Sequence, residues 1–511
     1  MAKAKHTWLL VGVVGLAFAL RVAGLDFQSL WRDEVDAIRF ATRAWDDLLR
    51  MFVVPGQNGP LYYLALRPWL HLAGLSEYAL RFFSVIFGTL AVPLVYRVAR
   101  RLFPSFPSLA LLASILTATS PYLVWYGQEG KMYSLVLALV LLSMDRYLAA
   151  LESGGWQRWL LYVAFTGAAV YVHLIAALMV PVQIIAFFLV GGETRKARWK
   201  AWLASTGVLV LPYVPLLRWQ LPLVLSPADT GYQFVPLNDM LVSLLVNYSL
   251  GLNSGTLRWA AFFFVVLLLA AGWLWRDHRP RLSSLGILAC WLCIPVLSLF
   301  LVTLVRPMYT ARYLIFVLPA YLLLLAAGVV AIARRSRLLA GLLLAALLVL
   351  NFLGLWRQSQ TPIKADLRSA TGYVASRQTP SDLLLFQIPY GRHSFDYYLP
   401  RYQEQQQSTQ DAAVTHHWDA DYLIFMPLVA GPGADTYRWA EGLYTNGGMG
   451  QDAAYAAMER LTAGNETVWL IASEVDLWDE RGLVQAWLEQ NASMADQAHF
   501  VGVSVYEYRL R

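Results

Sequence analysis

Paired carboxylates follow the first apolar segment of the chain, at Asp33 and Glu34 within SLWRDEVDAIRFATR. Later loops between apolar segments hold further charges, namely Glu129 and Lys131 in SPYLVWYGQEGKMYS and Arg306 and Arg312 in RPMYTARY. A carboxylate can act as general base toward a hydroxyl, and cations can stabilise a departing phosphate. These residue types therefore suit a transfer reaction that releases a phosphate and deprotonates a hydroxyl.

The composition predicts a polytopic membrane protein. Of the 511 residues, 58% are hydrophobic and only 14% are charged, whereas roughly a quarter of the residues of a soluble protein are charged. The formal net charge of +7 comes from short basic clusters between apolar runs. That placement follows the positive-inside rule and gives no basic face for a nucleic acid.

Eleven apolar segments are expected to span the membrane, with the N-terminus in the cytoplasm. A single helix needs roughly 20 residues to cross, so the long apolar run around His173 is interpreted as two short helices that turn there. The loops RVARR, RKARWK, RDHRPR and ARRSR are then all cytoplasmic under one alternation. The expected spans are residues 8–25, 78–98, 108–126, 132–150, 159–172, 174–190, 201–219, 257–275, 283–305, 312–333 and 338–356.

After Trp356 the apolar runs give way to alternating helix and strand patterns, among them LLLFQIP, DYLIFMP and ETVWLIAS. The chain is therefore divided into a transmembrane domain, residues 1–356, and a soluble α/β domain, residues 357–511. An odd number of spans places this second domain on the extracytoplasmic side. The loops with Asp33, Glu129 and Arg312 lie on the same side.

The charges at these outer loops are expected to line one cavity at the membrane surface, because carboxylates and cations recur at successive loop–helix junctions. Arg21, Arg50 and Arg67 are instead interpreted as solvated or snorkelling interfacial charges. The cavity suits sugar transfer from a polyprenyl phosphate, whose anionic leaving group needs cations and no proton donor. A transporter or flippase of a lipid-linked sugar and a scaffold protein are the alternatives, but charges confined to one face favour the transferase.

Five motifs occur in a fixed order along residues 8–356: WRDEVDAIRFA, NGPLYYLALRPWLHLAGLSEYALRFFSVIFG, SPYLVWYGQEGKMYSL, YVHLIAAL and RPMYTARYLIFVLPAYLLLLAAG. Together they resemble the GT-C superfamily of integral-membrane glycosyltransferases, in the branch of protein O-mannosyltransferases and aminoarabinose transferases. The resemblance implies an α-helical polytopic fold with about eleven transmembrane helices, juxtamembrane helices in the first outer loop and a C-terminal extracytoplasmic α/β domain. It also implies an inverting glycosyltransferase that moves a sugar from a polyprenyl-phosphate donor to a hydroxyl of a lipid, glycan or protein.

The resemblance further implies roles for individual residues. Asp33 matches the catalytic base and Glu34 its partner, and Glu129 matches an acid that orients the acceptor or the base. The residues expected to contact the donor phosphate are Lys131, His173, Arg312 and Tyr309, with Tyr133 and Gln128 in support. Two alternatives stay open: His173 as a hydrogen-bonded structural residue, and Asp33 as the cap of a helix that begins near Glu34.

The chain departs from the aminoarabinose branch at NGP, residues 58–60, where relatives have Glu-Lys before the proline. It also has Asp36 and Ala37 where some relatives have Arg and Tyr. The first departure removes a metal ligand and a phosphate contact, so no metal or other cofactor is expected to be required. The implied location is a bacterial-type cytoplasmic membrane with the active site outside. The expected partners are the lipid-linked donor, the acceptor and membrane lipid, and no nucleic acid.

Overall fold

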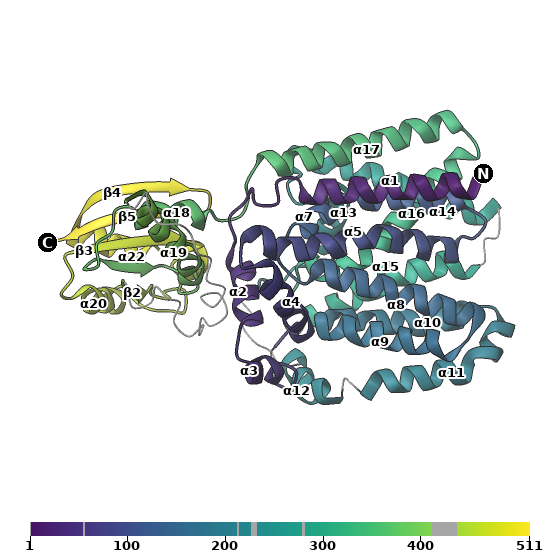
Figure 1. Ribbon diagram of the computed structural model, residues 1–511, viewed down its shortest axis with the longest axis horizontal. Helices are drawn as coiled ribbons and strands as arrows, with labels where there is room; N and C mark the ends of the chain where they lie inside the picture. Colours follow the sequence, from purple (N-terminus) through teal and green to yellow (C-terminus); the bar gives the residue numbers. More distant parts are fainter. Residues whose placement is uncertain (1, 55–56, 212–213, 226–231, 278–281, 411–436) are drawn as a thin grey trace. The chain divides into compact units, whose positions relative to one another are not determined.

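The computed structural model describes residues 2–511 except 55–56, 212–213, 226–231, 278–281 and 411–436 (Figure 1). The chain forms two compact units. The first unit consists of Met1–Leu25, Trp45–Leu66 and Arg81–Thr361, and the second of Asp26–Ala44, Arg67–Leu80 and Pro362–Arg511. The sequence places the domain boundary after Trp356, whereas the last long helix of the first unit runs to Gln360. The second unit in addition contains two segments of the first predicted outer loop.

Helices build the first unit, and two of them, α4 and α5, also have residues in the second unit. They are α1 (Ala2–Val22), α3 (Trp45–Arg50), α4 (Pro60–Ala73), α5 (Glu77–Leu102), α6 (Pro107–Thr119), α7 (Pro121–Gly127), α8 (Tyr133–Ser153), α9 (Trp156–Val172), η1 (Leu174–Leu178), α10 (Met179–Leu189), α11 (Gly192–Val210), α12 (Val214–Leu225), α13 (Leu237–Leu250), η3 (Gly255–Ala260), α14 (Ala261–Asp277), α15 (Leu282–Thr303), η4 (Ala311–Val317), α16 (Leu318–Ala333) and α17 (Arg337–Gln360).

Several of these helices can span a membrane, and the chain is an integral membrane protein. Among the described residues, six helices are long and apolar enough, and the bent pair of α6 and α7 makes a seventh. The stretches His6–Val22 and Leu174–Leu189 form shorter apolar helices. Each predicted span overlaps a helix or a helix pair, although the one at 8–25 runs past the end of α1 at Val22. The described residues of the span at 201–219 belong mainly to α11 and α12. The total of eleven spans stays a prediction.

Close packing at a glycine joins two of the spans. Helices α14 and α16 make extensive contact, and a Cβ atom at Gly328 would lie 2.1 Å from the carbonyl oxygen of Leu267. Only a residue without a side chain lets the two backbones approach this closely. Small residues at such contacts are typical of helix pairs in membranes, where tight packing replaces the hydrophobic driving force.

Helices α6 and α7 meet at a bend of 58° next to Ser120. Pro121, at the start of α7, has no backbone N–H to continue the helix. Two polar side chains of α17 fasten the bend: Asn351 Nδ2 donates to Thr119 Oγ1 at 3.0 Å, and Gln358 Nε2 donates to the Pro121 carbonyl at 3.2 Å. The bend sets the direction in which the chain enters the loop at Gln128.

Arg21 is not the interfacial charge that the sequence predicts. Its side chain is fully buried, and its two Nη atoms donate to the carbonyls of Ala118 and Thr117, each at 3.3 Å. The last carbonyls of a helix lack intrahelical partners and carry partial negative charge, so the guanidinium pairs with the C-terminal end of α6. Glycines make room for it, because a Cβ atom at Gly88 or Gly127 would lie about 3 Å from the Arg21 side chain.

Among the described residues, a five-stranded sheet forms the centre of the second unit, in the order β2-β1-β3-β5-β4. Strand β1 pairs in parallel with β2 and β3, whereas β5 pairs antiparallel with β3 and with β4. The strands are β1 (Leu383–Phe386), β2 (Arg438–Glu441), β3 (Thr467–Ser473), β4 (Ala492–Phe500) and β5 (Val503–Leu510). The helices are α2 (Arg32–Ala41), α18 (Leu367–Ala375), α19 (Gly391–Gln410), α20 (Gln451–Thr462), α21 (Val475–Trp478) and α22 (Leu483–Asn491).

Both faces of the central strands are buried, as their continuous apolar runs predict. Leu384 and Phe386 pack with residues of α18 and α19, while Leu383 and Leu385 pack with residues of α20 and α22. The predicted α/β architecture is therefore confirmed. The predicted strand DYLIFMP lies outside the described residues.

The first predicted outer loop contains the expected juxtamembrane helices α2, α3 and α4. Helix α2 contacts α19 within the second unit. Its buried side consists of Glu34, Val35, Ala37, Ile38 and Ala41. A carboxylate at the start of an otherwise apolar buried side needs a partner, which the site below supplies.

Candidate functional site

The predicted site residues fall into two groups. Asp33 and Glu34 belong to the second unit, and all the others belong to the first. The residues of the first unit are Gln128, Glu129, Lys131, Tyr133, His173, Tyr309 and Arg312.

The loop after α7 is held from two sides in the first unit. Gln128 Nε2 donates to the Ala23 carbonyl at 2.7 Å, at the end of α1, and Ser84 Oγ of α5 donates to the Lys131 carbonyl at 3.2 Å. A tight turn brings the Lys131 N–H within 2.7 Å of the Glu129 carbonyl. Both charged side chains of this loop, Glu129 and Lys131, are buried. The predicted supporting residue Gln128 thus acts as an anchor of the loop.

Aromatic rings connect this loop to the two other predicted segments. The Tyr133 ring centroid lies 6.1 Å from His173, and His173 lies 5.2 Å from Tyr313. The guanidinium carbon of Arg312 lies 5.9 Å from the Tyr133 ring centroid. The Tyr126 ring centroid lies 5.2 Å from that of Tyr133. The structure therefore brings the three motifs of the first unit together.

His173 lies between α9 and η1, and its side chain is 2% exposed. Neither ring nitrogen has a hydrogen-bond partner within the part of the chain that the structure describes. The alternative in which hydrogen bonds from the described residues hold His173 in a structural role is therefore wrong. Burial, and then the positive charges of Arg312 and Lys131, lower the pKa of His173 to about 3. The ring is therefore neutral at physiological pH, and the positive charge nearby comes from Arg312 and Lys131.

Tyr309 has a partner of its own. Its hydroxyl donates to the Met240 carbonyl of α13 at 3.3 Å, and its side chain is 8% exposed. This bond attaches the RPMYTARY segment to α13. Its contact with a phosphate stays a prediction.

Asn58 and Gly59 are site residues that the sequence reasoning missed, because it treated NGP only as the loss of a metal ligand. Asn58 Oδ1 accepts from the Leu174 N–H at 3.3 Å. Gly59 has a φ of +78° and lies between Met132 and Val172, the neighbours of Lys131 and His173 in sequence. The turn thus joins the loop after α7 to the turn at His173. The sequence signal for this turn was Gly59, which stands directly before Pro60.

Gly59→Ala should destabilise the first unit and reduce activity. The left-handed backbone costs about 1–2 kcal/mol for a residue with a Cβ atom, and this atom would lie 3.1 Å from the Val172 carbonyl and 2.9 Å from Met132 Cε. Thermal unfolding in detergent measures the loss. Gly74→Ala is the matched control, because Gly74 has a φ of +84° but no described atom lies within 4 Å of the place that its Cβ atom would take. Equal losses in the two variants would contradict a packing role for Gly59.

In the second unit, α2 begins at Arg32, and its N-cap residue Trp31 makes no side-chain cap bond. Asp33 is the second residue of the helix, so the alternative that Asp33 caps a helix beginning near Glu34 is wrong. Asp33 is half-buried, whereas Glu34 is fully buried. Glu34 Oε2 lies 2.9 Å from Lys364 Nζ, whose side chain is 9% exposed. The two adjacent carboxylates therefore have different surroundings.

Clusters of metal-binding side chains are absent from the described part of the chain. Outside the undescribed segments, no group of three or more His, Cys, Asp or Glu side chains could hold a metal ion. The expectation that no metal is required stays a prediction.

Known proteins are similar to this chain in sequence or in fold. Residues 57–219 match the family model described as dolichyl-phosphate-mannose-protein mannosyltransferase. No curated protein sequence matches the chain. The structure of ArnT from Cupriavidus metallidurans in the apo state superposes with a TM-score of 0.56 and 15% identity, over 99% of this chain and 98% of that one.

Two further solved structures are similar. The Archaeoglobus fulgidus oligosaccharyltransferase, in complex with Zn and sulfate, has a TM-score of 0.55 and 15% identity over 98% of this chain and 72% of that one. The arabinofuranosyltransferase AftD from Mycobacteria has a TM-score of 0.53 and 14% identity over 99% of this chain and 40% of that one. At these identities the similarity shows a shared fold.

Proposed function

Because the chain has the GT-C fold of integral-membrane glycosyltransferases, we propose that it moves a sugar from a polyprenyl-phosphate donor to a hydroxyl acceptor. The observation that carries the proposal is the buried His173 beside Lys131 and Arg312, with no hydrogen-bond partner among the described residues. A neutral imidazole close to cations can donate one hydrogen bond to an anion, and the cations supply the charge. ArnT from Cupriavidus metallidurans, whose fold is similar, has a structure bound to undecaprenyl phosphate.

On the donor side, the chemistry needs positive charge more than it needs a proton donor. As the bond between the sugar C1 atom and the phosphate oxygen breaks, that oxygen gains negative charge. Lys131 and Arg312 stabilise this charge, and His173 donates a hydrogen bond to a phosphate oxygen. The polyprenyl phosphate leaves as an anion that requires no general acid.

On the acceptor side, Asp33 acts as the general base. The acceptor hydroxyl oxygen attacks C1 from the face opposite the phosphate, and its proton passes to the Asp33 carboxylate. One displacement of this kind inverts the configuration at C1. Glu129 orients the acceptor or the base, and Tyr133 and Tyr309 support the donor side.

The reaction takes place at the outer face of a bacterial-type cytoplasmic membrane, where a polyprenyl-linked donor and its acceptor can meet. The basic loops of the sequence support this orientation. The acceptor is a lipid, a glycan or a protein.

Purified protein, incubated with a panel of labelled polyprenyl-phosphate sugars and a membrane extract that contains acceptors, tests the proposal. We expect one donor to lose its sugar to an acceptor, with inversion of the anomeric configuration. Liposomes that hold the same donors in one leaflet provide the second arm. Translocation of a donor across the bilayer without transfer from any member of the panel would favour the flippase and overturn the proposal.

A further inference from the structure

Two segments far apart in sequence are joined within the second unit, at the point where the chain leaves α17 and enters the α/β fold. Gln28 Oε1 accepts hydrogen bonds from the backbone N–H groups of Ile363 and Lys364, each at 3.0 Å. Ser29 Oγ donates to the Ala365 carbonyl at 2.9 Å. The chain just before Asp33 is therefore bonded to the segment 363–365.

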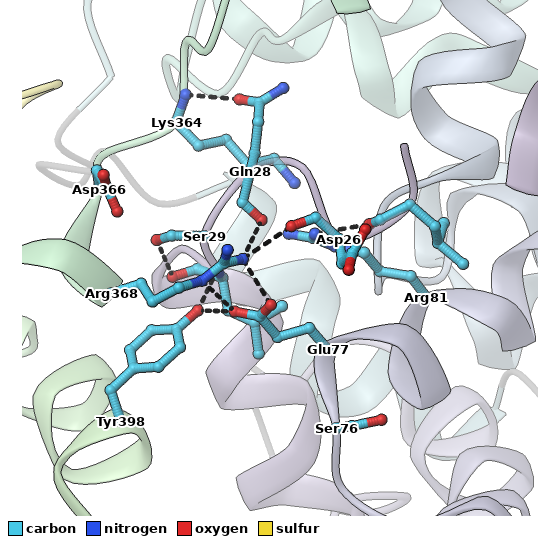
Figure 2. Close-up of polar contacts among 12 residues, drawn as sticks. Asp26, Gln28, Ser29, Ser76, Glu77, Arg81, Lys364, Asp366, Arg368 and Tyr398 are labelled. Atoms are coloured by element: carbon cyan, nitrogen blue, oxygen red, sulfur yellow. Dashed lines mark hydrogen bonds and ion pairs between the residues drawn. The ribbon is translucent and has the colours of Figure 1, made fainter. Parts of the chain in front are cut away.

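A second set of bonds lies beside the first and centres on Arg368 and Glu77 (Figure 2). Arg368 Nε donates to Glu77 Oε1 at 3.1 Å, and Arg368 Nη2 donates to the Asp26 and Gln28 carbonyls at 2.9 and 3.2 Å. The Tyr398 hydroxyl donates to Glu77 and accepts from the Leu30 N–H at 2.7 Å. Both predicted loop segments, 26–44 and 67–80, are thus attached to the α/β fold.

Glu34 completes this arrangement. Its carboxylate is fully buried, and Lys364 Nζ lies 2.9 Å from Oε2. Because this carboxylate is closed to solvent and lies against Lys364, it is poorly placed to contact a substrate. Asp33, the preceding residue, is half-buried. Adjacent residues of a helix point about 100° apart, so the burial of Glu34 fixes the direction in which Asp33 points.

We infer that Glu34 and Lys364 are a pair of positioning residues that orient Asp33 through α2. The loop that carries Asp33 therefore requires Lys364 of the α/β domain for its catalytic arrangement. The inference rests on the proposed function, in which Asp33 is the base. It reassigns Glu34, which the sequence groups with the catalytic acids, to a role without substrate contact.

Exchange of the two charges tests the inference. Glu34→Lys and Lys364→Glu should each lower kcat by about 10- to 100-fold, because small misplacements of a catalytic group have effects of this size. The KM for the donor should change less, since neither residue binds the phosphate. The double variant Glu34→Lys/Lys364→Glu should recover most of the lost kcat. A folded double variant that stays as inactive as the single variants would overturn the inference.

A neutral pair gives a second measurement in case the exchanged pair does not fold. Glu34→Gln/Lys364→Gln keeps a hydrogen bond without charges, and its kcat should stay within about tenfold of the wild type, far above the level of Asp33→Asn. The matched control is the exposed ion pair Arg377–Asp496 of the same unit, with side chains 45% and 44% exposed. Its charge exchange should leave kcat unchanged, because exposed pairs contribute little.

Thermal unfolding separates a failure of this inference from a failure of the proposed function. The midpoint should fall in each single variant and recover in the exchanged pair, whether or not a sugar is transferred. Recovered midpoints together with a wild-type protein that transfers no sugar would overturn the proposed function alone. Midpoints that do not recover in a folded exchanged pair, nor in the neutral pair, would overturn the pairing itself.

Discussion

Asp33→Asn should lower the rate of sugar transfer by about 10²–10⁴-fold, the usual effect of removing a general base. Asparagine has nearly the same shape as aspartate and can accept a hydrogen bond, but it cannot take the acceptor proton. Asp33 is the second residue of α2, with no role as its N-cap, so the helix should keep its start. Donor binding should therefore survive. Single-turnover transfer and donor binding, measured on one preparation, provide the test.

Two comparisons sharpen this prediction. Asp47→Asn, an exposed position in the neighbouring helix α3, should leave the rate unchanged. Glu129→Gln should give an intermediate loss, since Glu129 orients a reactant without taking the proton. Normal transfer by a folded Asp33→Asn protein would mean that another group is the base.

Arg312→Ala should weaken donor binding and slow transfer together. A charge-assisted contact with a phosphate is worth about 1.5–3 kcal/mol, which corresponds to roughly a 10- to 150-fold change. The loss should appear in the Kd for polyprenyl phosphate alone, because the contact does not depend on the sugar. The rate should fall as well, since the charge on the phosphate oxygen grows in the transition state.

Arg258→Ala is the control for the loss of an arginine, because Arg258 lies over the Trp259 ring and is outside the five sequence motifs. Arg312→Lys should recover part of the affinity, because it restores the charge without the planar fork of the guanidinium. An Arg312→Ala protein with wild-type Kd and turnover would show that the phosphate is held elsewhere.

Much of the candidate site could be predicted because its charged residues occur in short sequence motifs at the ends of apolar segments. Carboxylates and cations at successive loop–helix junctions predicted the loop at Glu129 and Lys131 and the segment at Arg312, and the structure brings both to His173. The length of the apolar run around His173, together with cytoplasmic flanks on both sides of it, predicted a short hairpin. The run LLLFQIP predicted a strand, which the structure has as the buried strand β1.

What could not be predicted depends on partners distant in sequence. Arg21 has no acidic neighbour in its own segment and was interpreted as interfacial, but the carbonyls at the end of α6 accept its hydrogen bonds. Nothing in the sequence indicated that Glu34 pairs with Lys364, because Lys364 lies in a linker outside the recognised motifs. Gly59 is explained only by the atoms of Met132 and Val172 around it. Side chains satisfied by distant backbone or by one distant charge leave no periodic signal in a sequence.

The pairing of Glu34 with Lys364 has a consequence for biosynthesis. The two residues are 330 positions apart, so at about 5–20 residues per second the ribosome needs roughly 15–65 s to make the second after the first. During that time the helices between them can enter the membrane, while the first loop waits for the Lys364 ammonium that lies beside Glu34 in the finished structure. Premature termination or proteolysis anywhere before Lys364 would leave an inserted but inactive membrane protein. The organism thereby gains a simple safeguard, because only a chain translated past Lys364 can form the Glu34–Lys364 pair.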